Sequence, residues 1–210
     1  MSTLPESFVT IKGEAHTEFE EKRSVFIGHA RRCDSEEAAA EFIKEIKKEY
    51  SDATHNVYGY SINGGILARY SDDGEPQGTA GMPVLDTIRK NGVNNVCVVV
   101  TRYFGGTLLG AGGLVRAYSH AAALAIEEAG IVTFEPYSEY SLKCGYSEYQ
   151  KYSAYFSSMN VLVDDTVFDA DVTVTFAVRR RSAETIVKKI VEMSYGRDVP
   201  TLIGERFDYR

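Results

Sequence analysis

Residues 96–120 read VCVVVTRYFGGTLLGAGGLVRAYSH and decide how the first part of this 210-residue chain is built. The run VCVVVTRY is almost continuously apolar, which predicts a strand buried on both faces of a sheet. Beyond the glycines, apolar side chains recur at helical spacing from Leu114 to Ala125, so we predict a helix from Gly113 to Gly130. A strand, a glycine-rich turn and a helix in this order indicate an α/β or α+β domain.

The glycine-rich segment has two interpretations that the sequence leaves open. Glycines before a helix let an anion approach free backbone N–H groups, and Arg102 would add a positive charge there. Alternatively, the glycines only allow the strand and the helix to pack closely. The segment lacks the Gly-Lys-Ser/Thr of a phosphate-binding P-loop, and no second strand carries the acidic residue of a dinucleotide fingerprint.

A polar loop upstream is part of the same candidate site. Its sequence, SDDGEPQGTAGMP at residues 71–83, is rich in turn formers, and we expect it to meet the glycine-rich segment in one cleft. Its three carboxylates would suit a divalent cation, although an ordinary Asp-Gly turn also explains them. The candidate ligand-binding residues are His55, Asp72, Asp73, Glu75, Arg102, Gly105, Gly106, Gly110, Gly112, Gly113, Arg116 and His120.

The sequence predicts no metal, no cofactor and no essential thiol. Cys33, Cys97 and Cys144 lie far apart and form no CxxC pair, so a zinc site and a disulfide framework are both unexpected. The chain has no Gly-x-Ser-x-Gly elbow and no His-Glu-x-x-His zinc motif. We therefore assign no catalytic residue from the sequence.

Charge and hydropathy limit the partners. The formal net charge is −7, and residues 1–135 carry 13 basic and 19 acidic side chains, against 10 and 11 in residues 136–210. A protein that coats nucleic acid through bulk charge is therefore excluded, and any contact needs a local basic patch. No apolar run approaches the roughly 20 residues of a membrane helix, and no signal peptide is recognisable. We expect a cytoplasmic protein that does not bind membranes.

Strands and helices mix in the residues before the glycine-rich segment. A strand is predicted at residues 24–33, SVFIGHARRC, followed by a helix over residues 36–50 that begins after Asp34 or Ser35. The strands HNVYGYSI and GILARYSD flank Asn63-Gly64-Gly65, which signals a hairpin. A further helix over residues 82–90 is expected to stop at Asn91-Gly92.

The pattern changes near Pro136, where we place a boundary between domains at residues 1–135 and 136–210. The predicted order is a strand at 137–144, a helix at 146–159, strands at 160–168 and 170–179, a helix at 182–194 and a strand at 198–209. This βαββαβ order is ferredoxin-like. Tyrosines at positions 146, 149, 152 and 155 are interpreted as a packing stripe rather than a base-stacking surface.

Two long blocks of the chain resemble the IMPACT family. They are YSDDGEPQGTAGMPVL and VVVTRYFGGTLLGAGGLVRAYS, and with ATHNVYGY they cover residues 53–119; the chain length is similar to that of bacterial, YigZ-like members. The resemblance implies an α+β protein whose first domain is an α/β sandwich like domain 2 of ribosomal protein S5. It also implies a ferredoxin-like second domain similar to the last domain of elongation factor G. Val57 stands where the family often has cysteine, which excludes a Cys–His nucleophile here.

The resemblance further implies a link to translation. Eukaryotic relatives, which carry a different partner domain, regulate translation through a kinase that senses amino-acid starvation. We therefore predict a non-enzymatic module that binds RNA, the ribosome or a translation factor. The alternative is an enzyme acting on a small phosphorylated or carboxylated molecule in the glycine-rich cleft. The oligomeric state stays open, and the candidate nucleic-acid contacts are Arg179, Arg180, Arg181, Lys188 and Lys189.

Overall fold

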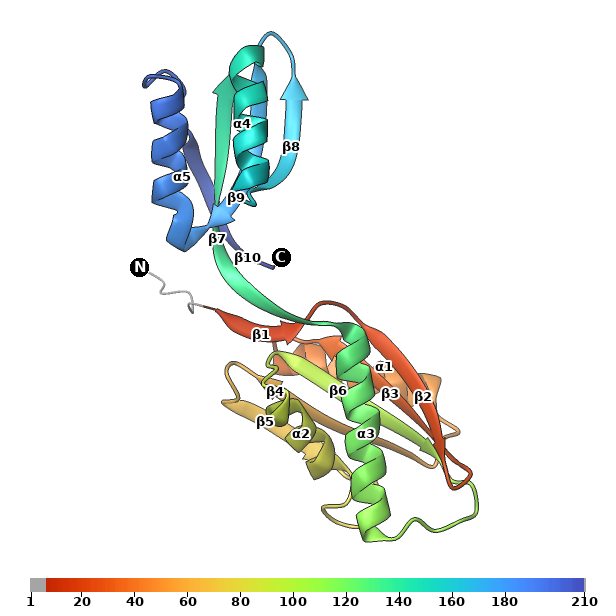
Figure 1. Ribbon diagram of the computed structural model, residues 1–210. Helices are drawn as coiled ribbons and strands as arrows, with labels where there is room; N and C mark the ends of the chain where they lie inside the picture. The colour runs from red at the N-terminus through yellow and green to blue at the C-terminus, as the bar shows by residue number, and fades with distance from the viewer. Residues whose placement is uncertain (1–6, 210) are drawn as a thin grey trace. The chain divides into compact units, whose positions relative to one another are not determined.

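The computed structural model describes residues 7–209, which form two domains (Figure 1). The first domain comprises Phe8–Thr133, and the second begins at Phe134 and also includes Ser7. The division therefore falls two residues before the boundary expected at Pro136. Residues 1–6 and Arg210, which the expected domains also include, lie outside the described residues.

The first domain is built on an antiparallel sheet with the strand order β2-β3-β6-β4-β5. These strands are β2 (Ala15–Glu21), β3 (Ser24–Arg32), β6 (Val96–Tyr103), β4 (His55–Ile62) and β5 (Leu67–Ser71). The predicted strand at residues 24–33, the hairpin and the buried strand after residue 95 are confirmed. The short strand β1 (Phe8–Ile11) and β2 were not predicted, and β1 lies beside the start of β7.

Helices cover both faces of this sheet (Figure 1). α1 (Glu36–Glu49) packs on one face, and α2 (Gly81–Lys90) and α3 (Ala111–Ala129) pack on the other. Ser35 rather than Asp34 caps α1, because its side chain accepts the N–H of Ala38. Since apolar side chains meet helices on both faces, β6 is buried along almost its whole length, as its sequence predicted.

The second domain has the predicted βαββαβ order. It comprises β7 (Ile131–Cys144), whose first residues belong to the first domain, α4 (Tyr146–Ser158), β8 (Leu162–Phe168), β9 (Val172–Arg179), α5 (Arg180–Met193) and β10 (Thr201–Asp208). The strands lie in the order β10-β7-β9-β8, and both helices cover one face (Figure 1). Tyr152 is buried and Tyr149 and Tyr155 pack against the same core, so these three form a packing stripe, whereas Tyr146 is half-exposed.

The α+β class and the two-domain architecture are thus confirmed, while the likeness to elongation factor G stays a prediction. Two helices begin two residues earlier than expected. α3 begins at Ala111 instead of Gly113, and α5 begins at Arg180, so two of the three consecutive arginines lie in a helix rather than at a strand exit. Among the helices of residues 7–209, none is long and apolar enough to cross a membrane.

Candidate functional site

A buried ion pair joins the polar loop to the strand before the glycine-rich segment. Oε1 of Glu75 lies 2.6 Å from Nη1 of Arg102, at the end of β6, and both side chains are nearly inaccessible to solvent. The same oxygen accepts a hydrogen bond of 2.7 Å from the hydroxyl of Tyr118 in α3, and Nη2 of Arg102 donates to Ser24 Oγ. The expected meeting of the two segments is confirmed by this ion pair.

Burial of this cluster has electrostatic consequences. Desolvation raises the pKa of the Tyr118 hydroxyl, and the neighbouring Glu75 carboxylate raises it further. Tyr118 is therefore protonated at neutral pH and donates its hydrogen bond to Glu75. Because Arg102 and Tyr118 both satisfy one carboxylate oxygen, the geometry of Glu75 is fixed before any ligand arrives.

His55, the first residue of β4, lies beside this pair. Its Nδ1 is 2.8 Å from the backbone oxygen of Asp73, and its Nε2 is 3.8 Å from Oε1 of Glu75. A carbonyl oxygen only accepts hydrogen bonds, so Nδ1 carries the proton of the neutral ring. Nε2 of neutral His55 is therefore an acceptor that faces Glu75.

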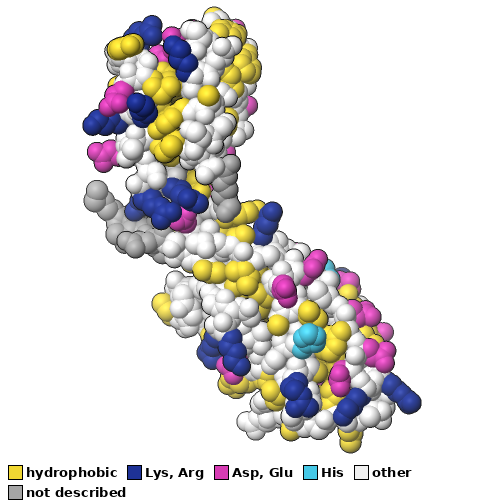
Figure 2. All heavy atoms as spheres, in the orientation of Figure 1, with side chains coloured by type: hydrophobic (Ala, Val, Ile, Leu, Met, Phe, Trp, Pro, Cys, Tyr) yellow, Lys and Arg dark blue, Asp and Glu magenta, His cyan; other side chains and the backbone are white. Residues whose placement is uncertain are grey.

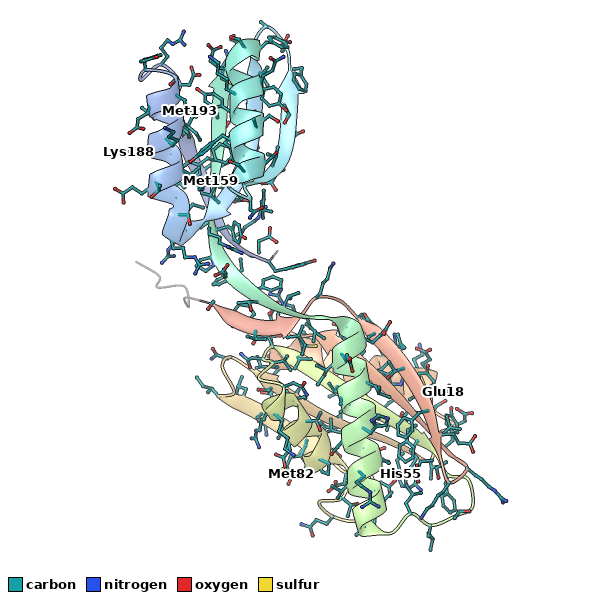
Figure 3. The ribbon with its side chains drawn as sticks, in the orientation of Figure 1. Glu18, His55, Met82, Met159, Lys188 and Met193 are labelled. Atoms are coloured by element: carbon teal, nitrogen blue, oxygen red, sulfur yellow. The ribbon has the colours of Figure 1, made fainter. Side chains whose placement is uncertain are left out.

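His55, Glu75 and Arg102 line a pocket of about 360 Å³ in the first domain. Figure 3 shows His55 near the N-terminal end of α3, in agreement with the lining of this pocket. The other walls are mostly apolar. We call this cavity the His55 pocket, and its lining residues are Thr54, His55, Glu75, Pro76, Arg102, Phe104, Leu108, Leu109, Gly110, Ala111 and Leu114.

The candidates from the sequence do not all lie together. His55, Glu75, Arg102 and Gly110 line the His55 pocket. A separate depression of about 250 Å³ is lined by three of the four candidates of α3, which are Gly113, Arg116 and His120, while the fourth, Gly112, lines neither.

Asp72 closes the polar loop onto the start of α2. Its Oδ2 accepts the N–H of Gly78 at 2.8 Å, and its Oδ1 accepts those of Ala80 and Gly81 at 3.1 and 2.8 Å. Ala80 offers no capping side chain to this helix. Asp72 therefore supplies the acceptor that the start of α2 needs. This role agrees with the interpretation of the polar loop as an ordinary turn.

Asp73 is held by the neighbouring strand and by α1. Its Oδ1 lies 2.6 Å from Nζ of Lys47, and its Oδ2 accepts the N–H of Asn56 at 2.7 Å. Burial opposes ionisation, but these two donors prevail and lower the pKa of Asp73. The carboxylates of the polar loop thus bind different partners. Within residues 7–209, no three His, Cys, Asp or Glu side chains are arranged to hold a metal ion.

Packing and backbone conformation account for several of the glycines. A side chain on Gly105 would collide with the backbone carbonyl of Arg23, and Gly106 and Gly110 have positive φ angles of 83° and 74°. Gly112 lies in open space apart from a guanidinium nitrogen of Arg116 at 3.6 Å. Close packing therefore explains Gly105, whereas it does not explain Gly112.

This difference gives a matched pair of substitutions. We expect Gly105→Ala to lower the free energy of unfolding by about 1–3 kcal/mol, because the backbone of Arg23 must move. Gly112→Ala, inside α3, is expected to raise it by roughly 0.5–1 kcal/mol through helix propensity. Urea unfolding of both variants checks this, and equal effects would show that the close approach at Gly105 is unimportant.

The three cysteines lie away from the His55 pocket, and all are buried. Burial raises the pKa of the thiols of Cys33 and Cys144 to about 11, and it raises the pKa of Cys97 as well. A thiol with such a pKa is almost fully protonated at neutral pH and is a poor nucleophile. The structure thus gives a physical reason for the prediction of no essential thiol, which stays a prediction.

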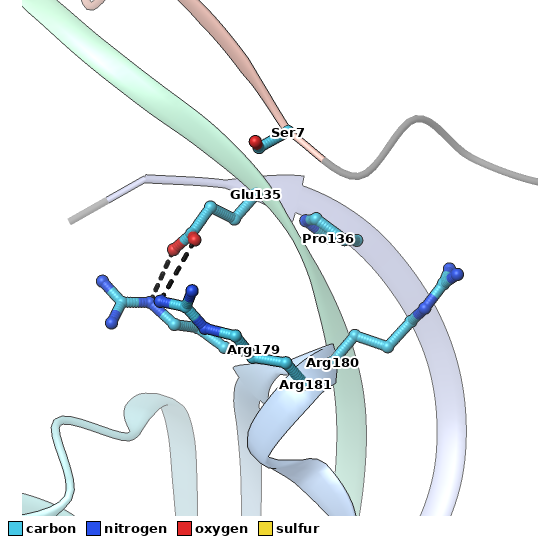
Figure 4. Close-up of a pocket in the computed structure, with 6 residues that line it drawn as sticks. All are labelled: Ser7, Glu135, Pro136, Arg179, Arg180 and Arg181. Atoms are coloured by element: carbon cyan, nitrogen blue, oxygen red, sulfur yellow. Dashed lines mark ion pairs between the residues drawn. The ribbon is translucent and has the colours of Figure 1, made fainter.

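In the second domain, the three consecutive arginines line a depression of about 500 Å³ with Ser7, Glu135 and Pro136. Figure 4 shows Arg179 and Arg181 paired with Glu135, at 2.7 and 3.3 Å, while Arg180 points away. Arg180 lies 3.6 Å from Glu205. Two acidic side chains therefore oppose the three cations of this arginine cluster.

The rest of this domain is not strongly basic. Lys188 is exposed on α5 (Figure 3), and exposed Lys189 lies 3.8 Å from Glu192. On the face shown in Figure 2, Lys and Arg side chains along α5 lie among Asp and Glu side chains. Arg206 of β10 pairs with Glu139 of β7 and Asp164 of β8. Carboxylates thus accompany most cations of the domain.

The sequence did not identify several residues of the His55 pocket and its cluster. Tyr118 lies at helical spacing from Leu114 and Ala125 on the apolar face of the predicted helix, and its hydroxyl there was the available signal, because a buried hydroxyl needs a partner. Ser24 carried no signal. The apolar lining residues Phe104, Leu108, Leu109 and Leu114 also carried none, because apolar side chains in a sequence do not distinguish a pocket wall from a core.

Two family models match the two halves of this α+β chain. The Impact N-terminal domain matches residues 22–126, and a domain of unknown function, DUF1949, matches residues 142–197. The chain belongs to the IMPACT family. The match to IMPACT family member YigZ of Escherichia coli has 32% identity and covers 83% of this chain and 87% of that protein.

Two further comparisons agree. IMPACT family member YvyE of Bacillus subtilis is 43% identical over 127 residues, which are 60% of this chain and 58% of that protein. A solved structure, described as the crystal structure of a hypothetical protein, is similar with a TM-score of 0.61 at 30% identity. The alignment covers 96% of this chain and 99% of that one, so the similarity includes both domains.

Proposed function

We propose that this protein is a non-enzymatic, translation-associated module, and that the His55 pocket is where its first domain holds a partner or ligand. The observation that carries the proposal is the buried Glu75–Arg102 pair at the pocket. Burying two charges is costly unless they are paired and hydrogen-bonded, so such a pair within a pocket is more typical of a binding site than of a passive core. The translational role rests on the eukaryotic relatives of the family.

The composition of the pocket favours binding over catalysis. Glu75 is engaged by Arg102 and Tyr118, so it is not free to act as a base. Among the described residues of the lining, the only side-chain hydroxyl belongs to Thr54, whose Oγ1 accepts the N–H of Phe104. Nε2 of His55 and the second oxygen of Glu75 remain as acceptors, and a general base with no nucleophile beside it in the described lining supports binding more than reaction.

Leu108 allows a test of the pocket without disturbing the fold, because its side chain is 82% exposed. We expect Leu108→Glu to weaken co-sedimentation of the full chain with ribosomes at least about tenfold, since a carboxylate would enter an apolar wall. Ile66→Glu is the matched control, because Ile66 is 78% exposed and does not line the pocket.

The outcomes are distinct. Wild-type binding by Ile66→Glu and loss of binding by Leu108→Glu would support the proposal. Equal binding by Leu108→Glu and wild type would remove the pocket from the function. Turnover of a small phosphorylated or carboxylated compound, abolished by His55→Ala, would replace the proposal with the enzyme alternative.

A second candidate is direct RNA binding by the arginine cluster, Arg179–Arg181, of the second domain. The observation in its favour is that all three side chains line one depression and are 40–69% exposed. Exposed ion pairs contribute little stability, so the three arginines could exchange Glu135 and Glu205 for phosphates at low cost.

Counterion release gives this candidate a quantitative test. With two to four phosphate contacts, the logarithm of the RNA-binding constant is expected to fall with the logarithm of salt at a slope of roughly −1.5 to −3. Changing all three arginines of the cluster to alanine should weaken binding and flatten the slope. Changing Arg89 and Lys90 of α2 to alanine, which also removes exposed cations, should leave the slope unchanged. An unchanged slope in the triple variant would refute the candidate.

A further inference from the structure

We infer that the His55 pocket takes a nucleobase that carries an exocyclic amino group, such as adenine, with this amino group placed between His55 and Glu75. The inference rests on the proposed function, because it accepts this pocket as the binding site. It adds the chemical class of the ligand, and it follows from the single polar wall of the pocket, the charge balance of that wall and the apolar surfaces around it.

The polar wall offers two hydrogen-bond acceptors that no described residue uses. Nδ1 of His55 donates to the backbone oxygen of Asp73, so Nε2 of the neutral ring is an acceptor. Oε1 of Glu75 accepts from Arg102 and Tyr118, whereas Oε2 accepts no hydrogen bond among residues 7–209. Neither Nε2 nor Oε2 belongs to the side-chain atoms of these residues that are both fully buried and unpartnered, so a ligand can reach both.

The two acceptors are neighbours and suit a single donor group. Nε2 of His55 is 3.8 Å from Oε1 of Glu75, so the imidazole and the carboxylate lie side by side. An amino group has two N–H donors, and each can meet one of these acceptors. A carbonyl or phosphate oxygen in its place would set acceptor against acceptor. The wall therefore favours a ligand that donates twice from one nitrogen.

The charge balance of the wall favours a neutral amino group over an ammonium group. Glu75 and Arg102 form an ion pair of 2.6 Å, and no other residue of the described lining carries a permanent charge. An ammonium group would bring a third charge into a partly apolar cavity without a counter-charge of its own, which is costly. The exocyclic amino group of a base is neutral and still donates hydrogen bonds.

The surfaces around the polar wall suit a flat ring. Phe104 is half-exposed, and the guanidinium carbon of Arg102 lies 5.4 Å from the centroid of its ring. Bases stack on exposed aromatic side chains. Leu108, Leu109 and Leu114 add apolar surface, and the volume of about 360 Å³ is within the range for small-molecule sites, which starts at about 300 Å³. A primary amide also donates twice, but it covers less of this apolar surface than a base does.

Adenosine is a simple probe of this class, and three analogues change only its amino group. Purine riboside lacks the group, 6-dimethylaminopurine riboside keeps the nitrogen without its hydrogens, and inosine has a carbonyl oxygen in its place. In calorimetric titrations of the full chain at neutral pH, we expect adenosine to bind at least about tenfold more tightly than each analogue, because each leaves both acceptors of the wall unpaired.

Two variants separate the polar wall from the apolar surfaces. His55→Ala removes one acceptor, so the preference for adenosine over purine riboside should fall to about threefold or less. Phe104→Ala should weaken both ligands by the same factor and keep the preference, because a phenyl ring stacks on either base. Ile66→Glu, outside the pocket, should bind adenosine as wild type does. The analogue series uses the wild-type chain, so it tests the inference even if a variant does not fold.

The base can belong to RNA or to a free nucleoside, and oligonucleotides distinguish these sources. Single-stranded oligoadenylate that binds at least about tenfold more tightly than adenosine, with weak binding of oligouridylate, would assign the pocket to a base of RNA. Oligoadenylate that binds no more tightly than adenosine would assign it to a free nucleoside.

Equal binding of adenosine and purine riboside, tighter binding of 3-methylbutylamine or inorganic phosphate than of adenosine, or no response to adenosine at about 5 mM would overturn the inference. If adenosine fails while Leu108→Glu still abolishes ribosome binding, the proposed function stands without this ligand class. If adenosine binds with the expected preference while ribosome binding is insensitive to Leu108→Glu, the ligand class stands and the translational role of the pocket fails.

Discussion

Replacing Arg102 with leucine is expected to lower the free energy of unfolding by about 3–5 kcal/mol. The substitution removes the cation from a Glu75 carboxylate whose side chain is only 4% exposed and leaves Tyr118 as its only close donor. An unpaired buried carboxylate must then be protonated, hydrated by local opening, or tolerated at high cost. Because domains of this size are stable by about 5–15 kcal/mol, urea unfolding should detect the loss easily.

A second substitution tests the cause of this loss. Adding Glu75→Gln to Arg102→Leu removes the unpaired charge while keeping an acceptor for Tyr118, so the double variant should regain about 2 kcal/mol. Arg116→Leu is the control, because Arg116 is exposed on α3 and should stay within about 0.5 kcal/mol of wild type. If the double variant is as unstable as Arg102→Leu or more so, the loss comes from the volume and packing of Arg102 instead.

Acidification from pH 7 to pH 4 should lower the stability of the first domain through His29. This side chain is fully buried on β3, and desolvation, with a smaller contribution from His16, lowers its pKa to about 4. In the unfolded chain the pKa is about 6.5, so the unfolded state binds the proton first. The contribution of neutral His29 to the free energy of unfolding is complete above about pH 6.5. It is lost as the pH falls towards 4, to a total of roughly 3 kcal/mol.

The hydrogen-bond directions around His29 give a second reason why its protonation is unfavourable in the folded state. Thr101 donates to Asn56 Oδ1 at 2.7 Å, so it accepts from Nε2 of His29 at 3.1 Å. Nδ1 of His29 must then be the acceptor for Nδ1 of His16, 2.7 Å away. Protonation of His29 would place two N–H groups against each other. Glu14, 3.6 Å from Nε2 of His16, offsets this only in part.

The measurement is urea unfolding at several pH values between 4 and 7. His29→Gln retains a donor and an acceptor but does not titrate. Over this pH range its free energy of unfolding should therefore change by roughly 3 kcal/mol less than that of wild type. His120→Gln is the control, because His120 is exposed on α3 and its substitution should leave the pH dependence as in wild type. Identical pH profiles for wild type and His29→Gln would contradict the assignment.

Much of the fold follows from the sequence because its elements have strong patterns. The run VCVVV predicts the buried strand β6, Asn63-Gly64-Gly65 predicts the β4–β5 hairpin, and Ser35 predicts the start of α1. β2 was missed because AHTEFEE contains three glutamates and a single large apolar residue. An edge strand needs only one buried face and a paired neighbour, and neither requirement leaves a strong local pattern.

The candidate site was less predictable than the fold. The sequence brought His55, Glu75 and Arg102 into one candidate set, but it assigned the charge of Arg102 to an anionic ligand. In the structure Glu75, 27 positions earlier, takes this charge. Asp72 and Asp73 lie beside Glu75 in the sequence and face different partners. Which carboxylate of a turn enters a pocket depends on backbone directions, which composition does not specify.

The central place of β6 has a consequence for how the chain emerges from a ribosome. β6 pairs with β3 on one side and with β4 on the other, so neither strand has its main neighbour until Val96–Tyr103 has been made. At synthesis rates of roughly 5–20 residues per second, the interval between Arg32 and Val96 leaves β3 waiting for several seconds. During that time β3 has only β2 as a partner, and its apolar side chains are exposed to solvent. The nascent first domain therefore depends on late closure, and slow elongation through this interval would prolong its exposure to misassembly.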